Sequence, residues 1–235
     1  MEKDGREMRL YVILEAILFV AIKIAELALP VRPMKIVMYT AIVVNTAAAI
    51  WLYRKYGKTA RRQWDNLIAL ALMVNCLADV FLTLIGGEQM FVPGFALFCT
   101  VEAIYAIYLK PDRINLAVRA VLFALFLLVA RRLDLLTLAN ALGLLNLSLL
   151  SVNVFSAWMA RRREKSKASL LFAFALSCFL IGDVSVALEI FTAEGTLFHT
   201  IAALAVWTFY VPAQVLIVLT YHERIRPKTV SAGRN

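Results

Sequence analysis

The stretch NCLADVFL, residues Asn75–Leu82, places the carboxylate of Asp79 within an otherwise apolar run. In the second half of the chain, the stretch CFLIGDV, residues Cys178–Val184, does the same with Asp183. An ionised carboxylate in hydrocarbon is costly, so acidic residues inside membrane spans indicate a functional site. If the surrounding apolar runs cross a membrane, they are the spans of the fold, and the two aspartates are its candidate functional site.

The composition indicates an integral membrane protein. Of the 235 residues, 62% are hydrophobic and only 17% are charged, and the mean hydropathy is +0.78. The chain is far more apolar than a soluble globular domain. Apolar runs with short connections occupy nearly all of it. We therefore expect a single transmembrane domain over residues 1–235, with an uncleaved first span rather than a signal peptide.

Eight apolar runs have the length that a transmembrane helix requires, about 20 residues. Runs such as residues 118–130 do not alternate between polar and apolar side chains, which argues against the strands of a β-barrel. The sequence therefore predicts an all-α integral membrane protein with eight transmembrane helices. The predicted spans are residues 8–29, 35–53, 64–85, 91–109, 114–130, 135–159, 169–191 and 197–221.

Basic residues concentrate in alternate loops. The densest clusters lie within residues 54–62 and 161–167, which fall on the same side of the membrane as both termini. The positive-inside rule then predicts that both termini are cytoplasmic. Because these loops account for the net charge of +9, nucleic acid is not expected as a partner. The same bias, without a recognisable targeting segment, is typical of a bacterial inner (plasma) membrane protein.

Eight spans with both ends on one side of the membrane divide into two halves of four. The third and seventh spans then run in the same direction. Asp79 and Asp183 therefore lie at a similar depth, nearer the outer face. This arrangement is compatible with a 4+4 parallel repeat.

The two aspartates form a candidate catalytic pair. Two buried carboxyls that lie close together repel, so one is expected to hold its proton while the other is ionised. That combination supplies a general acid and a general base. The alternative is that each aspartate hydrogen-bonds to a neighbouring helix and only fixes the packing.

Other polar residues inside the spans extend the predicted pocket. Glu102 lies near the middle of the fourth span with Tyr105 one turn away, and a glutamate there must be protonated, paired or beside a cavity. Tyr210 and Gln214 share one face of the last span. Asn75 lies one turn before the first aspartate, where it can contact the same site.

Two further groups of polar residues are expected to be structural. Lys23 and Glu26 can pair across one turn of the first span, on the same stripe as Glu15. The remaining asparagines within the spans are expected to hydrogen-bond to neighbouring helices. These asparagines are Asn45, Asn140, Asn146 and Asn153.

No metal site and no cofactor are predicted. His199 and His222 lie at opposite ends of the last span, so a buried histidine site lacks ligands. Cys76 and Cys178 lie close to the aspartates but are expected to pack as small apolar side chains. The sequence contains no phosphate-binding glycine loop and no nucleophile elbow.

Short motifs spread over nearly the whole chain carry a family resemblance. They are Arg32-Pro33 at the second span, Asn75–Asp79 in the third, Gly94, Phe98, Glu102 and Tyr105 in the fourth, Phe179 and Asp183 in the seventh, and Tyr210, Ala213 and Gln214 in the eighth. With these motifs the chain resembles a divergent member of the YhhN-like lysoplasmalogenase family of polytopic membrane hydrolases. The family usually has His, Gly and Ser where this chain has Glu102, Ala78 and Gly182.

The resemblance implies a membrane hydrolase that cleaves the vinyl ether bond of lysoplasmalogens, a class of lysophospholipid, and releases a fatty aldehyde. Asp79 and Asp183 would then be the catalytic residues. Arg32, at the outer interface, would meet the phosphate of the lipid. The other residues expected to bind the substrate are Asn75, Glu102, Tyr105, Tyr210 and Gln214.

Two other functions fit the same residues. A proton-coupled transporter of a small molecule or lipid also needs acidic residues within its spans. Such carriers often have helices broken by Gly or Pro, however, and only Pro212 lies well inside a predicted span. The third interpretation is a lipid-binding relative without catalytic activity, since a carboxyl in place of the family's imidazole changes the protons available to the site.

Overall fold

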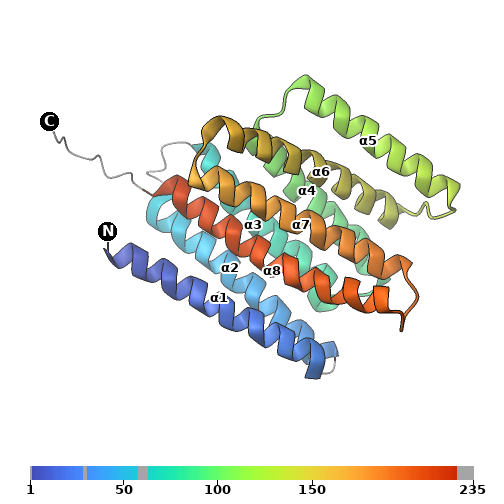
Figure 1. The fold of residues 1–235 in the computed structure, drawn as a ribbon, viewed down its shortest axis with the longest axis horizontal. Coiled ribbons are helices and arrows are strands. Elements are labelled where there is room, and N and C mark those ends of the chain that lie inside the picture. Colours follow the sequence, from blue (N-terminus) through green and yellow to red (C-terminus); the bar gives the residue numbers. More distant parts are fainter. Residues whose placement is uncertain (1, 29–30, 58–62, 227–235) are drawn as a thin grey trace.

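The computed structural model describes residues 2–28, 31–57 and 63–226, and the side chains of residues 2–4, 31, 32 and 63 lie outside that description. The described residues form long helices that run side by side (Figure 1). These are α1 (Glu2–Ala28), α2 (Val31–Tyr56), α3 (Asn66–Asp79), α4 (Phe91–Leu109), α5 (Arg113–Arg132), α6 (Leu138–Glu164), α7 (Lys167–Phe191) and α8 (Leu197–Ile225). The short elements are η2 (Gln63–Asp65), η3 (Val80–Ile85) and η4 (Glu88–Met90).

Seven helices of the described part are long and apolar enough to cross a membrane. They are α2 from Pro33 onward, α3 together with η3, and each helix from α4 to α8. The helix α1 is not among them, because Glu15, Lys23 and Glu26 interrupt its apolar run. The prediction of an all-helical membrane protein with eight helices is confirmed, and a membrane crossing by α1 stays a prediction.

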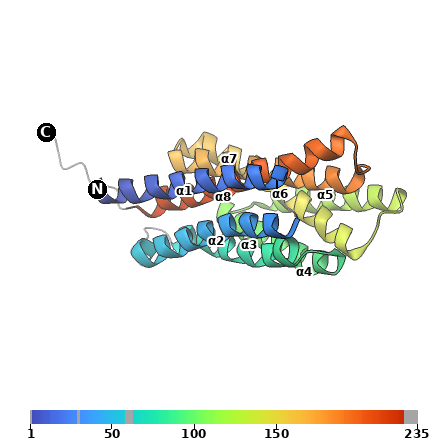
Figure 2. The same ribbon diagram turned by 90° about the horizontal axis from the view of Figure 1, so that it is seen from below.

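Six helices pack as a closed ring in the order α2, α3, α4, α6, α7 and α8, with α8 packed back against α2. Outside this ring, α1 packs on α2 and α8, and α5 packs on α6. Figure 2 shows α2, α3 and α4 as one layer beneath α1, α7 and α8. In each half of the chain the first helix is thus the outer one, as a 4+4 repeat requires. The repeat itself and the cytoplasmic termini stay predictions.

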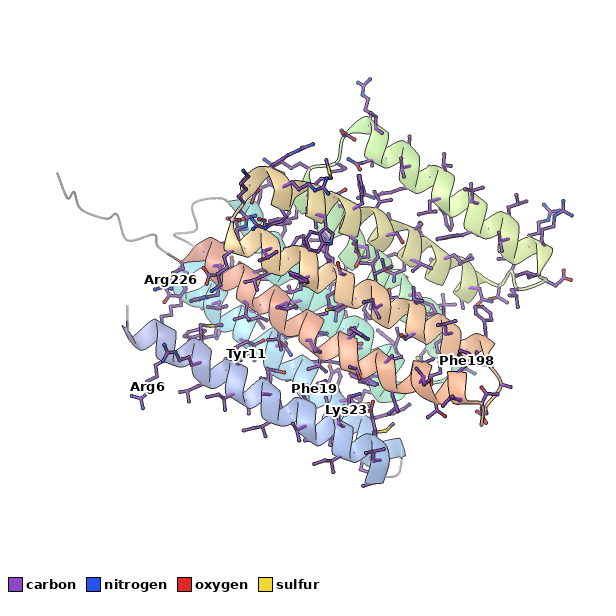
Figure 3. The ribbon with its side chains drawn as sticks, in the orientation of Figure 1. Arg6, Tyr11, Phe19, Lys23, Phe198 and Arg226 are labelled. Atoms are coloured by element: carbon purple, nitrogen blue, oxygen red, sulfur yellow. The ribbon has the colours of Figure 1, made fainter. Side chains whose placement is uncertain are left out.

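The polar stripe of α1 faces the bundle, where Figure 3 labels Tyr11 and Lys23. The Tyr11 hydroxyl donates to Oδ1 of Asn45 in α2 at 2.5 Å. The Lys23 ammonium donates to the backbone carbonyl of Leu204 in α8 at 2.9 Å and pairs with Glu26 at 2.7 Å. The predicted pairing of Lys23 with Glu26 is therefore present, and the stripe attaches α1 to two helices of the ring.

Side-chain caps set the starts of the last four helices. The residue before each helix accepts a hydrogen bond from the backbone N–H three residues on, which satisfies a donor that the helix leaves unpaired. These caps are Asp112, Thr137, Ser166 and Thr196. Each such cap is worth about 1 kcal/mol. Local sequence therefore determines where these helices begin.

The helix α3 changes its winding directly after Asp79. The next six residues, η3 (Val80–Ile85), form a π-helix. Gly86 and Gly87 then turn the chain with φ angles of 69° and 93°, a conformation that residues with a Cβ rarely adopt. Because π-helical turns frequently occur at functional sites, this break sets Asp79 apart from the regular helix before it.

Two helical glycines allow a matched test of the packing around η3. A Cβ on Gly94 of α4 would lie 2.4 Å from Cγ of Leu82 in η3, whereas a Cβ on Gly182 of α7 would lie 3.7 Å from the carbonyl oxygen of Val206. We expect Gly94→Ala to lower the free energy of unfolding by about 1–3 kcal/mol. Gly182→Ala should leave it nearly unchanged. Thermal denaturation of both variants in detergent measures the difference, and equal stabilities would contradict this packing.

Candidate functional site

A small cavity lies between α3, α4, α6 and α7, and it has room for about one water molecule. Half of its lining is polar and half is apolar. The lining residues are Asn75 from α3, Phe98, Val101 and Glu102 from α4, Asn146 and Leu150 from α6, and Phe179 and Asp183 from α7. The fold therefore brings residues from four helices, two of them acidic, to one point inside the bundle.

The carboxylate of Asp79 lies directly behind this cavity. Nδ2 of Asn75 donates to Oδ2 of Asp79 at 2.9 Å and to the hydroxyl of Tyr210 at 2.7 Å. The Tyr210 hydroxyl in turn donates to the same Oδ2. Thr83, in the π-helix, adds a longer contact of 3.5 Å to Oδ1. Asp79 is thus buried, held by α3 and α8 together, and linked to the cavity through Asn75.

The second aspartate faces the cavity itself. Nδ2 of Asn146 in α6 donates to Oδ2 of Asp183 in α7 at 2.7 Å. Oδ1 of Asn146 is buried and has no hydrogen-bond partner among the described residues. Since Asn146 and Asp183 both line the cavity, a water molecule placed there would lie beside an amide group and a carboxyl group. Asp183 and Asn146 therefore form a site that can both hold and orient water.

Glu102 is tied to a buried cation through an asparagine. Nδ2 of Asn153 in α6 donates to Oε2 of Glu102 at 2.7 Å and to its backbone carbonyl at 2.9 Å. Nη2 of Arg119 in α5 donates to Oδ1 of Asn153 at 2.6 Å. Arg119 and Ala130 are the only buried residues of α5, so this outer helix turns one charged side chain inward. These hydrogen bonds from Arg119 through Asn153 to Glu102, called the relay below, join α5, α6 and α4.

The structure brings together most of the residues that the sequence predicts for the site. Asn75, Glu102 and Asp183 line one cavity. Asp79 and Tyr210 lie behind Asn75 and are hydrogen-bonded to it. The catalytic and binding roles assigned to these residues stay predictions. Their arrangement supplies three carboxyl groups and several amide groups around a space for water, which suits proton transfer.

Two other predicted binding residues, Tyr105 and Gln214, do not line the cavity. The ring of Tyr105 packs edge-on against Phe172 of α7, with 5.5 Å between the ring centroids, and does not line the cavity. Gln214 is buried one turn after Tyr210 on α8, also away from the cavity lining. The side chain of Arg32 lies outside the described residues, so its contact with a lipid phosphate stays a prediction.

Sequence reasoning missed the part that α5 and α6 play in the site. Asn146 and Asn153 bond to neighbouring helices as expected, but their partners are the acidic side chains. The signal that could have revealed Arg119 is its position inside an apolar span, because a guanidinium there requires an anionic or polar partner. Among the described residues, no three His, Cys, Asp or Glu side chains lie close enough to hold a metal ion.

Buried carboxyl groups inside helices of membrane-spanning length define a polytopic integral membrane protein with an acidic site in its interior. The model of the YhhN family matches residues 31–221, and the chain belongs to that family, which is lysoplasmalogenase-like. The matched range begins with α2 and ends within α8, so it contains the six-helix ring, α5 and the whole cavity. No curated protein and no solved structure matches the chain.

The relay from Arg119 to Glu102 gives a stability prediction. Asn153→Ala leaves a buried carboxyl group and a buried guanidinium without their shared partner, so we expect the free energy of unfolding to fall by about 1–3 kcal/mol. The matched control is Asn140→Ala in the same helix, whose amide donates only to the Leu135 carbonyl in the preceding loop, at 2.6 Å. Thermal denaturation in detergent compares the two. A smaller loss for Asn153→Ala than for Asn140→Ala would contradict the importance of the relay.

Proposed function

We propose that this protein hydrolyses the vinyl ether bond of lysoplasmalogens and releases a fatty aldehyde and a glycerophospho-base. Membership of the YhhN family supports a function of the lysoplasmalogenase type. The observation that carries the specific chemistry is the cavity beside Asp183, because it combines carboxyl groups with room for one water molecule. Hydrolysis of a vinyl ether needs a proton donor, a negative charge and one water.

The reaction proceeds by proton transfer and addition of water. A carboxylic acid protonates the vinyl carbon next to the ether carbon, and the electron pair of the double bond forms the new C–H bond. The ether carbon becomes an oxocarbenium-like cation, which a nearby carboxylate stabilises. Water adds to this carbon and passes a proton to a carboxylate, which gives a hemiacetal. The hemiacetal then loses its hydroxyl proton to a carboxylate while a carboxylic acid protonates the glycerol oxygen, and cleavage of the bond to that oxygen releases the aldehyde and the alcohol.

The geometry supports a division of roles between the two aspartates. Asp183 lines the cavity and lies beside Asn146, so it can deliver a proton to a substrate carbon or receive one from water. Asp79 is held by Asn75 and Tyr210 behind the cavity, where its negative charge can stabilise the cation. Glu102 lines the same cavity and can bind the water or the substrate oxygen.

A conformational step is part of this proposal. The cavity has room for water but not for the glycerol and chain of a lysolipid. The substrate must therefore enter by a separation of the surrounding helices, which is a common step in enzymes with enclosed sites. Phe98, Leu150 and Phe179 line the apolar part of the cavity and would contact the alkenyl chain. Arg32 would then bind the lipid phosphate.

The helices of membrane-spanning length indicate an integral membrane protein. We place it in a bacterial inner membrane with both termini in the cytoplasm, on the basis of its basic loops. Because α3 and α7 would run in the same direction in this orientation, both aspartates would lie nearer the outer face.

The hydrolase proposal predicts the effect of removing each aspartate. In Asp183→Asn and Asp79→Asn, the rate of aldehyde release should fall at least about 100-fold, the usual effect of losing a positioned acid or base. The assay incubates purified protein with a panel of lysolipids and measures aldehyde separately from free fatty acid. Glu189→Gln, a carboxyl-to-amide change on α7 away from the cavity, is the control and should stay near the wild-type rate. Wild-type rates in both aspartate variants would refute the assignment.

One observation favours the transporter as a second candidate. The break from α-helix to π-helix directly after Asp79 resembles the interrupted helices that surround ion sites in carriers. Liposomes containing the protein separate the candidates. Uptake of solute driven by a pH gradient, without aldehyde release from any lysolipid, would favour the carrier. Lysolipid binding with neither activity would favour a non-catalytic relative.

A further inference from the structure

Arg119 is a charged side chain on the outer helix α5, which packs on α6 at the edge of the bundle (Figure 1). The residue is only 5% exposed, and it does not line the cavity. A buried guanidinium inside an apolar span is costly, so its position indicates a function. Nη2 donates to Asn153, whereas Nε and Nη1 have no partner among the described residues. The hydrogen bond that this guanidinium makes therefore leads to Asn153 and, through it, to Glu102.

Two contacts fix the orientation of the Asn153 amide. A guanidinium has N–H donors and no acceptor, so the amide must present its oxygen, Oδ1, to Arg119. On the opposite side, Nδ2 donates to two oxygens of Glu102, the backbone carbonyl at 2.9 Å and Oε2 at 2.7 Å. A turned amide would point N–H groups at the guanidinium and an oxygen at the carbonyl. Because Asn153 is fully buried, bulk water cannot replace the lost bonds, and the amide keeps one orientation.

The fixed amide determines which oxygen of Glu102 can carry a proton. Oε2 faces an N–H donor, so a proton bound to it would meet the hydrogen of Nδ2. A proton on Glu102 must therefore be on Oε1. This oxygen makes no hydrogen bond to the described residues. Since Glu102 lines the cavity, Oε1 is the oxygen that can donate to a molecule there.

The other acid that lines the cavity lacks this constraint. Asn146 donates to Oδ2 of Asp183, but its own oxygen has no partner among the described residues. No contact among those residues fixes the Asn146 amide, so either oxygen of Asp183 can carry a proton. Glu102 therefore differs from Asp183, because it holds its proton at a single position.

We propose that Arg119 is a positioning residue for the hydrolysis: through Asn153 it confines the proton of Glu102 to Oε1, and Glu102 donates that proton when the hemiacetal cleaves, a step that rests on the proposed function. The Oε1–H bond breaks as the glycerol oxygen takes the electron pair of its bond to the hemiacetal carbon and binds the proton. The hemiacetal hydroxyl gives its proton to a carboxylate of the site and becomes the aldehyde oxygen. The three acids thus give one proton and receive one.

Infrared spectroscopy of the purified full-length protein, without substrate, measures where Glu102 holds its proton. The C=O stretch of protonated Glu102 is the band that Glu102→Gln removes in a pH series from acidic to neutral. In the wild type this carbonyl accepts a hydrogen bond from Asn153, which lowers its frequency. Asn153→Asp keeps an acceptor for Arg119 but offers Glu102 no donor, so the band should shift. Arg119→Met leaves the amide free to turn and should also shift the band, whereas Arg119→Lys again supplies only donors and should not.

Aldehyde release measures the role of the proton in catalysis. Arg119→Met and Asn153→Asp should lower kcat at least about tenfold and change KM less than about twofold, because a misdirected proton slows the reaction without removing a substrate contact. Arg119→Lys should stay within about threefold of the wild-type kcat. The control Arg131→Met makes the same change at the exposed end of α5 and should stay within about twofold.

All rates are compared at a temperature where each variant is folded, because a purely structural role would lower stability and leave the kcat of the folded protein unchanged. Absence of aldehyde from the wild type would refute the hydrolase and the step at the glycerol oxygen, while the infrared band would still decide where Glu102 holds its proton. A wild-type kcat in Arg119→Met and Asn153→Asp, or no band that Glu102→Gln removes, would overturn the role of Arg119 and leave the hydrolase standing. If Arg119→Met does not fold, an unshifted band in Asn153→Asp has the same consequence.

Discussion

The hydrogen bonds that hold Asp79 are the interaction on which the rest of the site depends. A membrane interior offers no water to a buried carboxylate, so the protein itself must supply its partners. Asn75 and Tyr210 do so from α3 and α8, helices far apart in the sequence. The same contacts help to close the six-helix ring, because α8 packs against both α2 and α3. Site and fold are therefore stabilised by one set of polar contacts.

Each of the three acidic side chains at the site has an asparagine as its partner. An amide carries both a donor and an acceptor, so it can hydrogen-bond to a carboxyl group in either protonation state after a rotation of the side chain. A lysine or arginine in direct contact would favour only the charged state. The amide partners thus allow a proton to leave or arrive without loss of packing. The pairs are Asn75 with Asp79, Asn146 with Asp183, and Asn153 with Glu102.

The helices and the buried acids could be predicted from the sequence because both are local properties. The length of an apolar run sets the helix, as the predicted span 169–191 and the observed Lys167–Phe191 illustrate. Which helix a side chain contacts, by contrast, depends on residues far away in the sequence. Tyr105 lies three residues from Glu102 on one stripe of α4, yet it packs on α7 while Glu102 bonds to α6. The inward position of Arg119 and the π-helix after Asp79 likewise depend on packing between helices.

The aromatic contacts of α4 and α7 lie between the acidic site and one end of the bundle. Phe172 lies edge-on to both Tyr105 and Tyr108, with centroid distances of 5.5 and 5.1 Å. The Tyr105 hydroxyl has no hydrogen-bond partner among the described residues, so none of the hydrogen bonds described above continues from Glu102 through it. On this side, three packed rings therefore separate the buried acids from the end of the bundle where α4 ends and α7 begins.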